Sequence, residues 1–304
     1  MHTVSKMPND RRGFSLIELI VILALSTIVM GGLTSVLVRQ QRFYRGTADL
    51  IETRSQIRQA AGIIPSDLRG VSTIGGDILE ISDTSMIFWA TIGQAVTCVG
   101  IPGSNAISSP PLTLANGNTL ASFTMTPDLG DTVYVYQDGP TEAAADDYWK
   151  AYGISGPPAA STVACANAAL TGVVDLNTQR YSFPLAEALD LDISPGTPLR
   201  FVRRTRYTLY QAEDNSWYLG YCSPDCVGTP QPIAGPFLPG SGATKGVSFT
   251  YQDAAGAVTS VPANVAQVSI VVRGQTQGKV DMGGYANTTV GDSLRFSVAI
   301  RNRQ

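Results

Sequence analysis

An isolated carboxylate, Glu18, lies near the start of the chain within an otherwise apolar run. A carboxylate surrounded by lipid costs on the order of a few kcal/mol unless a cation pairs with it, so Glu18 needs a partner. The residues just before the run are basic and end in a glycine, since Arg11, Arg12 and Gly13 precede Phe14. These residue types and this spacing predict charge pairing in an apolar environment, and they give no sign of catalysis.

The rest of the chain offers little for catalysis. The sole histidine, His2, lies so close to the start that loss of a leader would remove every Ser-His, Cys-His or His-metal arrangement. The segment Gly240–Gly246 has the composition of a phosphate loop without its order of residues, and we interpret it as a hairpin loop. Asp146-Asp147 and Asp190-x-Asp192 could ligate calcium, but solvated loop carboxylates are the simpler interpretation. We therefore expect no enzyme activity, no cofactor and no metal.

The apolar run extends from Phe14 to Val38 and is long enough to cross a membrane. As a helix it would be about 37 Å long, against a hydrocarbon core of about 30 Å. Arginines flank both ends, so charge alone does not orient it. The helical pattern continues to Ile64, and Pro65 is the predicted stop because proline lacks the backbone donor. Gly31-Gly32 and Gly46 are predicted weak points of this helix.

The composition predicts a packed domain after Pro65. The chain has 304 residues, of which 44% are hydrophobic and 15% charged, and this excludes disorder for most of its length. Residues 71–304 hold 12 Lys and Arg against 19 Asp and Glu, and the balance of 12 − 19 = −7 argues against general nucleic-acid binding.

Stretches with a period of two predict strands in this body. The predicted strands are 84–92, 119–125, 132–137, 199–211, 216–221, 247–252, 265–273 and 293–301. Residues 213–215 and 253–256 are predicted turns, whereas 93–118 and 138–169 are predicted to be long loops. The alternating apolar residues of the last two strands predict inward faces, namely Val268, Ile270 and Val272 with Phe296, Val298 and Ile300. The predicted fold class is α+β, a long helix packed on an antiparallel sheet.

The stretch from Arg11 to Leu19 resembles the prepilins of type IV pili and the pseudopilins of type II secretion. In that superfamily a membrane peptidase cuts on the cytoplasmic side after a glycine and then N-methylates the new first residue. The resemblance implies cleavage between Gly13 and Phe14 and N-methylation of Phe14. It also implies that Glu18 pairs with the Phe14 ammonium of a neighbouring subunit. The simpler alternatives are a plain signal anchor and a glutamate that only reaches toward the membrane interface.

The resemblance implies a division of the chain into four parts. These are a cleaved leader (1–13), a transmembrane and assembly helix (14–38), its periplasmic continuation (39–65) and a globular pilin body (66–304). It implies a bacterial inner-membrane protein with its body in the periplasm, which later enters a pilus or pseudopilus filament. The implied partners are the prepilin peptidase, other major and minor pilins or pseudopilins, and the inner-membrane assembly platform, with no nucleic acid expected.

The body resembles PilW-like minor pilins and the related J-type pseudopilins. The resembling stretches are Arg206–Tyr210, Gly246–Gly256, Val268–Val272 and Leu294–Asn302. The expected function is a minor pilin that assembles at or near the tip of a type IV pilus and promotes pilus assembly. The alternatives are a J-type pseudopilin, an uncleaved single-span periplasmic adhesion or binding module, and an anchored enzyme.

Four cysteines lie in the body, and the resemblance places them in an oxidising periplasm. Four cysteines allow three sets of two disulfides. The closeness of Cys222 and Cys226 in the sequence favours a bond between them, which leaves Cys98 to pair with Cys165. A zinc site made of all four is the rival interpretation.

A basic cluster lies within the strand predicted over 199–211. Arg200, Arg204 and Arg206 share one face of that strand, with Arg203 on the other. The first three are candidates for a face that docks an anionic partner, and a solvated face bridged to nearby carboxylates is the simpler interpretation.

Overall fold

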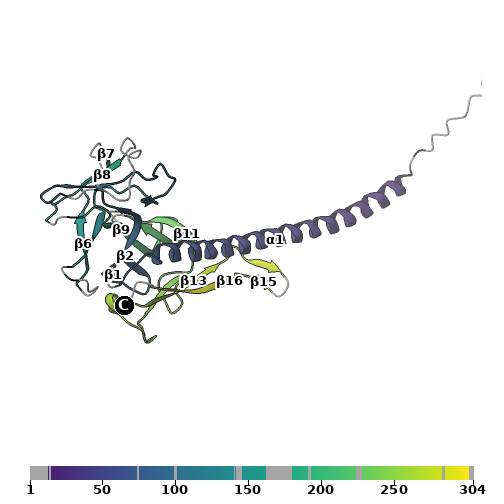
Figure 1. Ribbon diagram of the computed structural model, residues 1–304. Coiled ribbons are helices and arrows are strands. Elements are labelled where there is room, and N and C mark those ends of the chain that lie inside the picture. The colour runs from purple at the N-terminus through teal and green to yellow at the C-terminus, as the bar shows by residue number, and fades with distance from the viewer. Residues whose placement is uncertain are drawn as a thin grey trace, which may run out of the picture. The chain divides into compact units, whose positions relative to one another are not determined.

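The computed structural model describes residues 13, 15–73, 75–98, 101–139, 141, 146–161, 180–190, 193–223, 228–282 and 285–300. These residues form a long apolar N-terminal helix followed by antiparallel β-sheets (Figure 1), which confirms the predicted α+β, pilin-like fold class. The chain divides into two compact units. One comprises residues 1–52 with 276–290, and the other comprises 53–275 with 291–304.

The helix, α1 (Leu16–Leu68), continues beyond its predicted end. Pro65 lies inside the helix, so the predicted stop there is wrong. Proline removes one intrahelical donor, but Ile64 and Leu68 on either side of it are fully buried. Burial of two such side chains stabilises by about 3–6 kcal/mol, which outweighs the missing hydrogen bond. Gly31-Gly32 and Gly46 do not interrupt the helix either.

The strands follow in the order β1 (Ile78–Ile81), β2 (Ser85–Val96), β3 (Ala106–Ser109), β4 (Ser122–Phe123), β5 (Thr132–Gln137), β6 (Tyr148–Gly153), β7 (Ala159–Ser161), β8 (Arg180–Pro184), β9 (Pro198–Gln211), β10 (Trp217–Cys222), β11 (Gln231–Phe237), β12 (Val247–Gln252), β13 (Gln267–Gln275), β14 (Val280–Met282), β15 (Tyr285–Thr288) and β16 (Gly291–Ala299). A short 3₁₀ helix, η2 (Pro262–Asn264), precedes β13.

These strands pair into four sheets. The largest has the path β1-β2-β9-β10-β11, with β4 paired to β2 and the β5-β6 pair joined to β9. The others are β12-β13-β16, β3-β8-β7 and β14-β15. Every strand pairing is antiparallel, as hairpin-rich sequence with short connections predicts.

Two hydrophobic cores lie in the unit that starts at Thr53. The first joins residues 57–68 of α1 to the sheets containing β2 and β13, and the second joins the start of β9 to β5, β6 and β8. Strand β9 serves both, because Phe201 is buried in the second core and Tyr207 in the first. The predicted inward faces of β13 and β16 are confirmed, since Ile270 is fully buried and Val298 nearly so.

Both predicted long loops contain strands, so those predictions are wrong for the described residues. Strand β2 extends to Val96, and β3, β6 and β7 lie within the segments predicted as loops. Strand β6 pairs with β5 along its length, and β3 and β7 flank β8. Ile107 and Tyr152 are buried and anchor β3 and β6 in the second core, an attachment that a local pattern does not reveal. The predicted strand at 119–125 shrinks to the two residues of β4.

Both turn predictions are confirmed, and the interpretation of Gly240–Gly246 is wrong. Residues 253–256 form a turn in which the Gly256 N–H donates to the Asp253 carbonyl at 3.1 Å. Residues 213–215 join the paired strands β9 and β10, where Asn215 adopts a positive φ of 63°. Gly240–Gly246 connects β11 to β12, which belong to different sheets, so it is a crossing segment and not a hairpin loop. A side chain at Gly246 would lie 2.0 Å from the Leu238 carbonyl oxygen, which explains the glycine there.

Candidate functional site

The start of α1 is held by a bond between Ser15 and Glu18. Gly13 is exposed and Ser15 immediately precedes the first helical residue, Leu16. The Ser15 N–H donates to Glu18 Oε2 at 3.2 Å. This bond is one half of a capping box, in which the carboxylate three residues into the helix satisfies a backbone donor. A negative charge in the first turn also interacts favourably with the helix dipole.

The second carboxylate oxygen of Glu18 makes no hydrogen bond within the described part of the chain. Glu18 is exposed, so this oxygen can accept a bond from a cation on another molecule while the first oxygen caps the helix. Arg11, Arg12 and Phe14 lie outside the described residues, and their roles in processing stay predictions. The spacing Ser15-x-x-Glu18 in the sequence is the signal for this cap, in addition to the charge of Glu18 on which its predicted role rests.

The first part of α1 has the properties of a membrane span. Every side chain from Leu16 to Val38 is exposed, and an 18-residue window of the helix has a mean hydropathy of 2.4. The Thr27 hydroxyl donates to the Ala24 carbonyl at 2.8 Å, and the Thr34 hydroxyl donates to the Met30 carbonyl at 2.8 Å. Because these polar groups are satisfied inside the helix, they do not oppose its placement in lipid.

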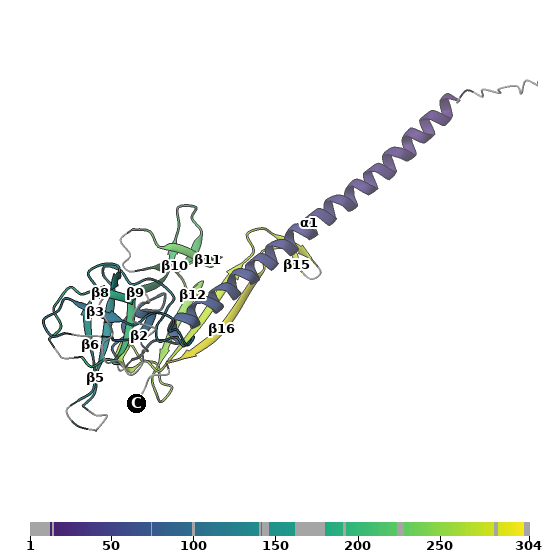
Figure 2. The ribbon, with the colours of Figure 1, turned by 45° about the horizontal axis from the view of Figure 1, so that its top comes forward.

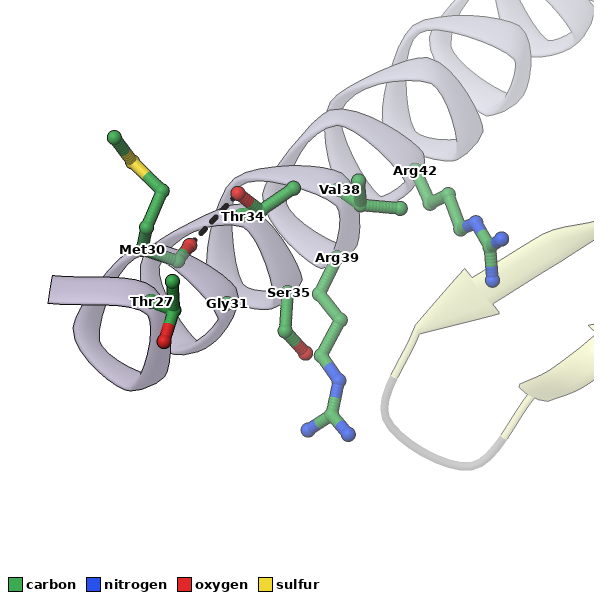
Figure 3. Close-up of a pocket in the computed structure, with 8 residues that line it drawn as sticks. All are labelled: Thr27, Met30, Gly31, Thr34, Ser35, Val38, Arg39 and Arg42. Carbon is green, nitrogen blue, oxygen red and sulfur yellow. Dashed lines mark hydrogen bonds between the residues drawn. The ribbon is translucent and has the colours of Figure 1, made fainter. Parts of the chain in front are cut away.

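A notch on this helix lies where the apolar run ends (Figure 3). The lining residues are Thr27, Met30, Gly31, Thr34, Ser35, Val38, Arg39 and Arg42. Thr27, Gly31 and Ser35 recur every four residues, and small side chains at this spacing allow a second helix to approach closely. Gly31 on its own predicts only a weak point of the helix. The spacing of Gly31 to Thr27 and Ser35 is the sequence signal for close packing of a second helix.

Gly46 is a contact point of the helix rather than a weak one. The hairpin β14-β15 belongs to the same compact unit as this part of α1. Gly46 is buried, and a Cβ atom there would lie 3.1 Å from Val280 Cγ1. The absence of a side chain at Gly46 therefore allows the fully buried Val280 to pack against the helix backbone.

The structure does not leave the predicted basic cluster as one open face. Arg200 Nη2 donates to Asp77 Oδ2 and to the Gly70 carbonyl, each at 2.7 Å, and Arg200 Nε donates to Thr91 Oγ1 at 3.0 Å. These contacts join β9 to the segment that follows α1, and Asp77 is fully buried. Arg200 therefore has a structural role that the period-two pattern did not indicate.

The other arginines of β9 differ in their surroundings. Arg203 binds Asp131 through two bonds of 2.7 and 2.6 Å, and this carboxylate raises the pKa of Arg203. Arg204 lies 3.8 Å from Glu80 in an exposed ion pair. Arg206 is half-buried. An anionic partner for Arg204 and Arg206 stays a prediction.

The predicted disulfides lie partly outside the described residues. Cys98 and Cys222 are buried and disulfide-bonded. Cys165 and Cys226 are not among the described residues, so the predicted pairing of Cys222 with Cys226 and of Cys98 with Cys165 stays a prediction.

The carboxylates considered for calcium have side-chain partners. Asp147 accepts a hydrogen bond from the Tyr136 hydroxyl, which lowers the pKa of Asp147 and raises that of Tyr136 to about 12. Asp190 accepts bonds from Lys150 and from the Tyr152 hydroxyl, and these bonds lower its pKa. Asp192 lies outside the described residues. Within the described ranges no three His, Cys, Asp or Glu side chains group to hold a metal.

Comparison with known proteins gives a match at the N-terminus. No curated protein and no solved structure matches the chain. Residues 8–34 match the family model of the prokaryotic N-terminal methylation motif, which covers Gly13, Glu18 and most of the apolar run. This motif belongs to structural pilin subunits rather than enzymes, and it implies processing by prepilin peptidase and assembly with other pilins. Together with the long exposed apolar helix, the motif supports a membrane-anchored, type IV pilin-like protein that assembles into a filament.

Proposed function

We propose that this protein is a minor pilin that assembles at or near the tip of a type IV pilus and promotes pilus assembly. The observation that carries the proposal is the continuity of the methylation motif with an exposed apolar helix whose first turn holds Glu18. Before assembly the helix anchors the chain in the inner membrane, with the body in the periplasm. Prepilin peptidase cleaves after Gly13 and the new N-terminus, Phe14, is methylated.

Assembly then depends on the two oxygens of Glu18. One oxygen caps the helix through the Ser15 N–H, and the other is available for the ammonium of Phe14 on a neighbouring subunit. Away from water this pairing stabilises both charges, each of which would otherwise be buried alone. A subunit that retains this glutamate can bind a further subunit on the side nearer the filament tip. The proposed position of this chain in the filament therefore includes places just behind the tip.

The PilW-like assignment rests on the body. Three of the four resembling stretches include parts of β12, β13 and β16, which are neighbours in one sheet, and the fourth lies on β9, whose Tyr207 and Leu209 belong to the same core. They therefore concern one packed region and not scattered surface segments. Deletion of the gene tests the assignment, because loss of pili with normal exoprotein secretion supports a minor pilin. Normal pili with retained exoproteins would instead indicate a J-type pseudopilin.

Two substitutions at Glu18 separate charge pairing from helix capping. Glu18→Gln keeps an oxygen that can accept the Ser15 N–H bond but removes the charge, whereas Glu18→Ala removes both. We expect both variants to be cleaved and retained in the membrane, since loss of a charge favours insertion into lipid. Both should be depleted from sheared filaments relative to inner-membrane levels, as measured by immunoblot. Incorporation of Glu18→Gln at the wild-type level would show that the charge is not needed.

A further inference from the structure

The sheet β12-β13-β16 has one open edge. Strand β16 pairs with β13 on one side only and lies at the margin of this sheet, in yellow in Figure 2. An edge strand presents unpaired N–H and C=O groups, which proteins usually shorten, interrupt or cover. At nine residues, β16 is the longest edge strand in the described part of the chain.

The register shows which backbone groups of β16 face outward. The Ile300 N–H donates to the Ala266 carbonyl at 2.9 Å, in line with the pairing of Ala299 with Gln267. On the other side of β13, the Arg273 N–H donates toward β12, to the Gly246 carbonyl at 2.7 Å. The direction of the backbone N–H and C=O groups alternates from one residue to the next along an antiparallel strand. The backbone groups of even-numbered residues of β16 therefore bond to β13, and those of odd-numbered residues point away from β13.

The outward-facing groups are available along most of the strand. The Ser293 N–H is occupied, since it donates to the Asp292 carboxylate at 2.8 Å. The N–H groups of Arg295, Ser297 and Ala299 make no hydrogen bond within the part of the chain that the structure describes. All three residues are exposed. An extended segment of four or five residues has the length to pair with these groups.

Several other edges in the described sheets are short, interrupted by proline or partly covered. On the outer side of β12, the Phe249 N–H donates to the Asp83 carbonyl at 2.8 Å, so part of that edge is already covered. Strand β11 carries Pro232 and Pro236, which cannot donate to a further strand. Strands β1 and β7 have four and three residues. Strand β16 has no proline, and among the described residues no strand pairs with its outer edge.

The side chains of β16 define the partner. Phe296 packs partly into the core and Leu294 on the same side is 36% exposed, so an added strand can bury apolar side chains against them. On the other side Arg295 is exposed and has no ion pair among the described residues, so a carboxylate there would be favourable. Two copies of β16 paired about their centre, Arg295, would place two guanidinium groups opposite each other, which disfavours a second copy as the partner.

We propose that an extended segment of a different filament subunit adds to β16 as a fourth strand of this sheet. Its residues alternate, apolar toward Leu294 and Phe296 and acidic toward Arg295. Main-chain hydrogen bonds provide the affinity and the alternating side chains provide the specificity. This inference rests on the proposed function, because it assumes that other pilin subunits surround the chain.

The test uses the full-length chain in cells with two variants at Ser297. Ser297→Pro removes an outward N–H and places a ring where the partner strand would approach, while the pairing to β13 does not use this N–H. Ser297→Ala keeps the N–H. Both variants lose the Ser297–Ser269 hydroxyl contact of 2.9 Å, so a difference in filament incorporation between them reports the outer edge of β16 and not the loss of this contact. We expect Ser297→Pro to lower incorporation into sheared filaments about tenfold and Ser297→Ala to match the wild type. Equal incorporation of both variants, at equal membrane levels and equal protease resistance, would overturn the proposal.

A photoreactive amino acid at Leu294 gives a second readout that does not require filaments. We expect a cross-link to another pilin subunit in inner membranes, lost when Ser297→Pro is added and kept when Ser297→Ala is added. A cross-link that persists with Ser297→Pro, or one formed only between two copies of this chain, would refute the proposal. Absence of the wild-type chain from sheared filaments would instead refute the proposed function, and the membrane cross-link would still decide the role of β16.

Discussion

The structure predicts that removal of Arg200, one of the arginines proposed for an anionic-partner face, destabilises the fold. Its guanidinium pairs with the fully buried Asp77 at 2.7 Å, and the Arg200 side chain itself is only 17% exposed. Arg200→Met keeps much of the side-chain length and removes the charge. Asp77 would then keep the Ser72 N–H bond of 2.6 Å but lose its only described cation.

The expected loss follows from the burial of that carboxylate. Removing one partner of a buried ion pair costs about 3–5 kcal/mol, because the remaining charge stays in an apolar environment. For a domain of this size the loss corresponds to a fall in Tm of about 6–20 °C. Arg204→Met is the matched control, since Arg204 and Glu80 are 38% and 69% exposed and lie 3.8 Å apart. Loss of such an exposed pair costs less than about 1 kcal/mol.

Urea unfolding of the detergent-solubilised full chain, followed by circular dichroism of the strands, measures both variants. Adding Asp77→Asn to Arg200→Met removes the unpaired charge and keeps an acceptor for Ser72, so we expect it to restore more than about half of the lost free energy of unfolding. If Arg200→Met costs no more than Arg204→Met, the structural role of Arg200 is refuted and the sequence interpretation of an open anionic-partner face is favoured.

Three further predictions concern other parts of the chain. Gly46→Leu should make residues 276–290 more accessible to protease, because even a Cβ atom at Gly46 would lie 3.1 Å from Val280 Cγ1. If protease cleaves Gly46→Leu no faster than Gly46→Ala, this packing is contradicted. Peptide mapping without reduction should find Cys222 joined to Cys226 and Cys98 joined to Cys165. Free thiols or a crossed pairing in the isolated protein would disprove this prediction. The bond between Tyr136 and Asp147 raises the pKa of Tyr136 from 10.0 to about 12 and lowers the pKa of Asp147 below 3.8. Its contribution to stability is therefore complete between pH 3.8 and pH 10.0. The contribution is lost as the pH rises from 10.0 through about 12, and it is lost again as the pH falls from 3.8 through the lowered pKa of Asp147. Phenolate absorbance of the wild type minus that of Tyr136→Phe should show the raised midpoint, and a midpoint near 10.0 would contradict the bond.

The sequence predicts those parts of the fold that local patterns determine. The apolar run and the period-two strands β9, β10, β12 and β13 follow from the arrangement of side chains along the chain. The helix end predicted at Pro65 is wrong because the burial of Ile64 and Leu68 depends on the sheet that covers them, and a local sequence rule does not include this sheet. Strands β3, β6 and β7 were missed for the same reason, since they are short and their stability comes from pairing with β8 and β5.

Some residues of the candidate site could be predicted from the sequence, and others could not. Gly13 and Glu18 are recognisable from residue type and spacing, and the match over residues 8–34 concerns the same segment. The role of Arg200 could not be predicted, because Asp77 lies 123 residues away in the sequence. The packing of Val280 against Gly46 likewise joins segments that are distant in sequence. Sequence spacing identifies groups that act within one helix, whereas groups that meet across the fold require the structure.

Intact-mass and N-terminal peptide analysis of the protein recovered from membranes tests the central claim most directly. The claim is that this chain is a processed, pilin-like subunit whose helix begins beside the cleavage site. The account predicts a mature chain of 304 − 13 = 291 residues that begins with N-methylated Phe14. It also predicts that Gly13→Val stays uncleaved. A wild-type chain that retains residues 1–13, or a Gly13→Val chain that matures normally, would contradict the account.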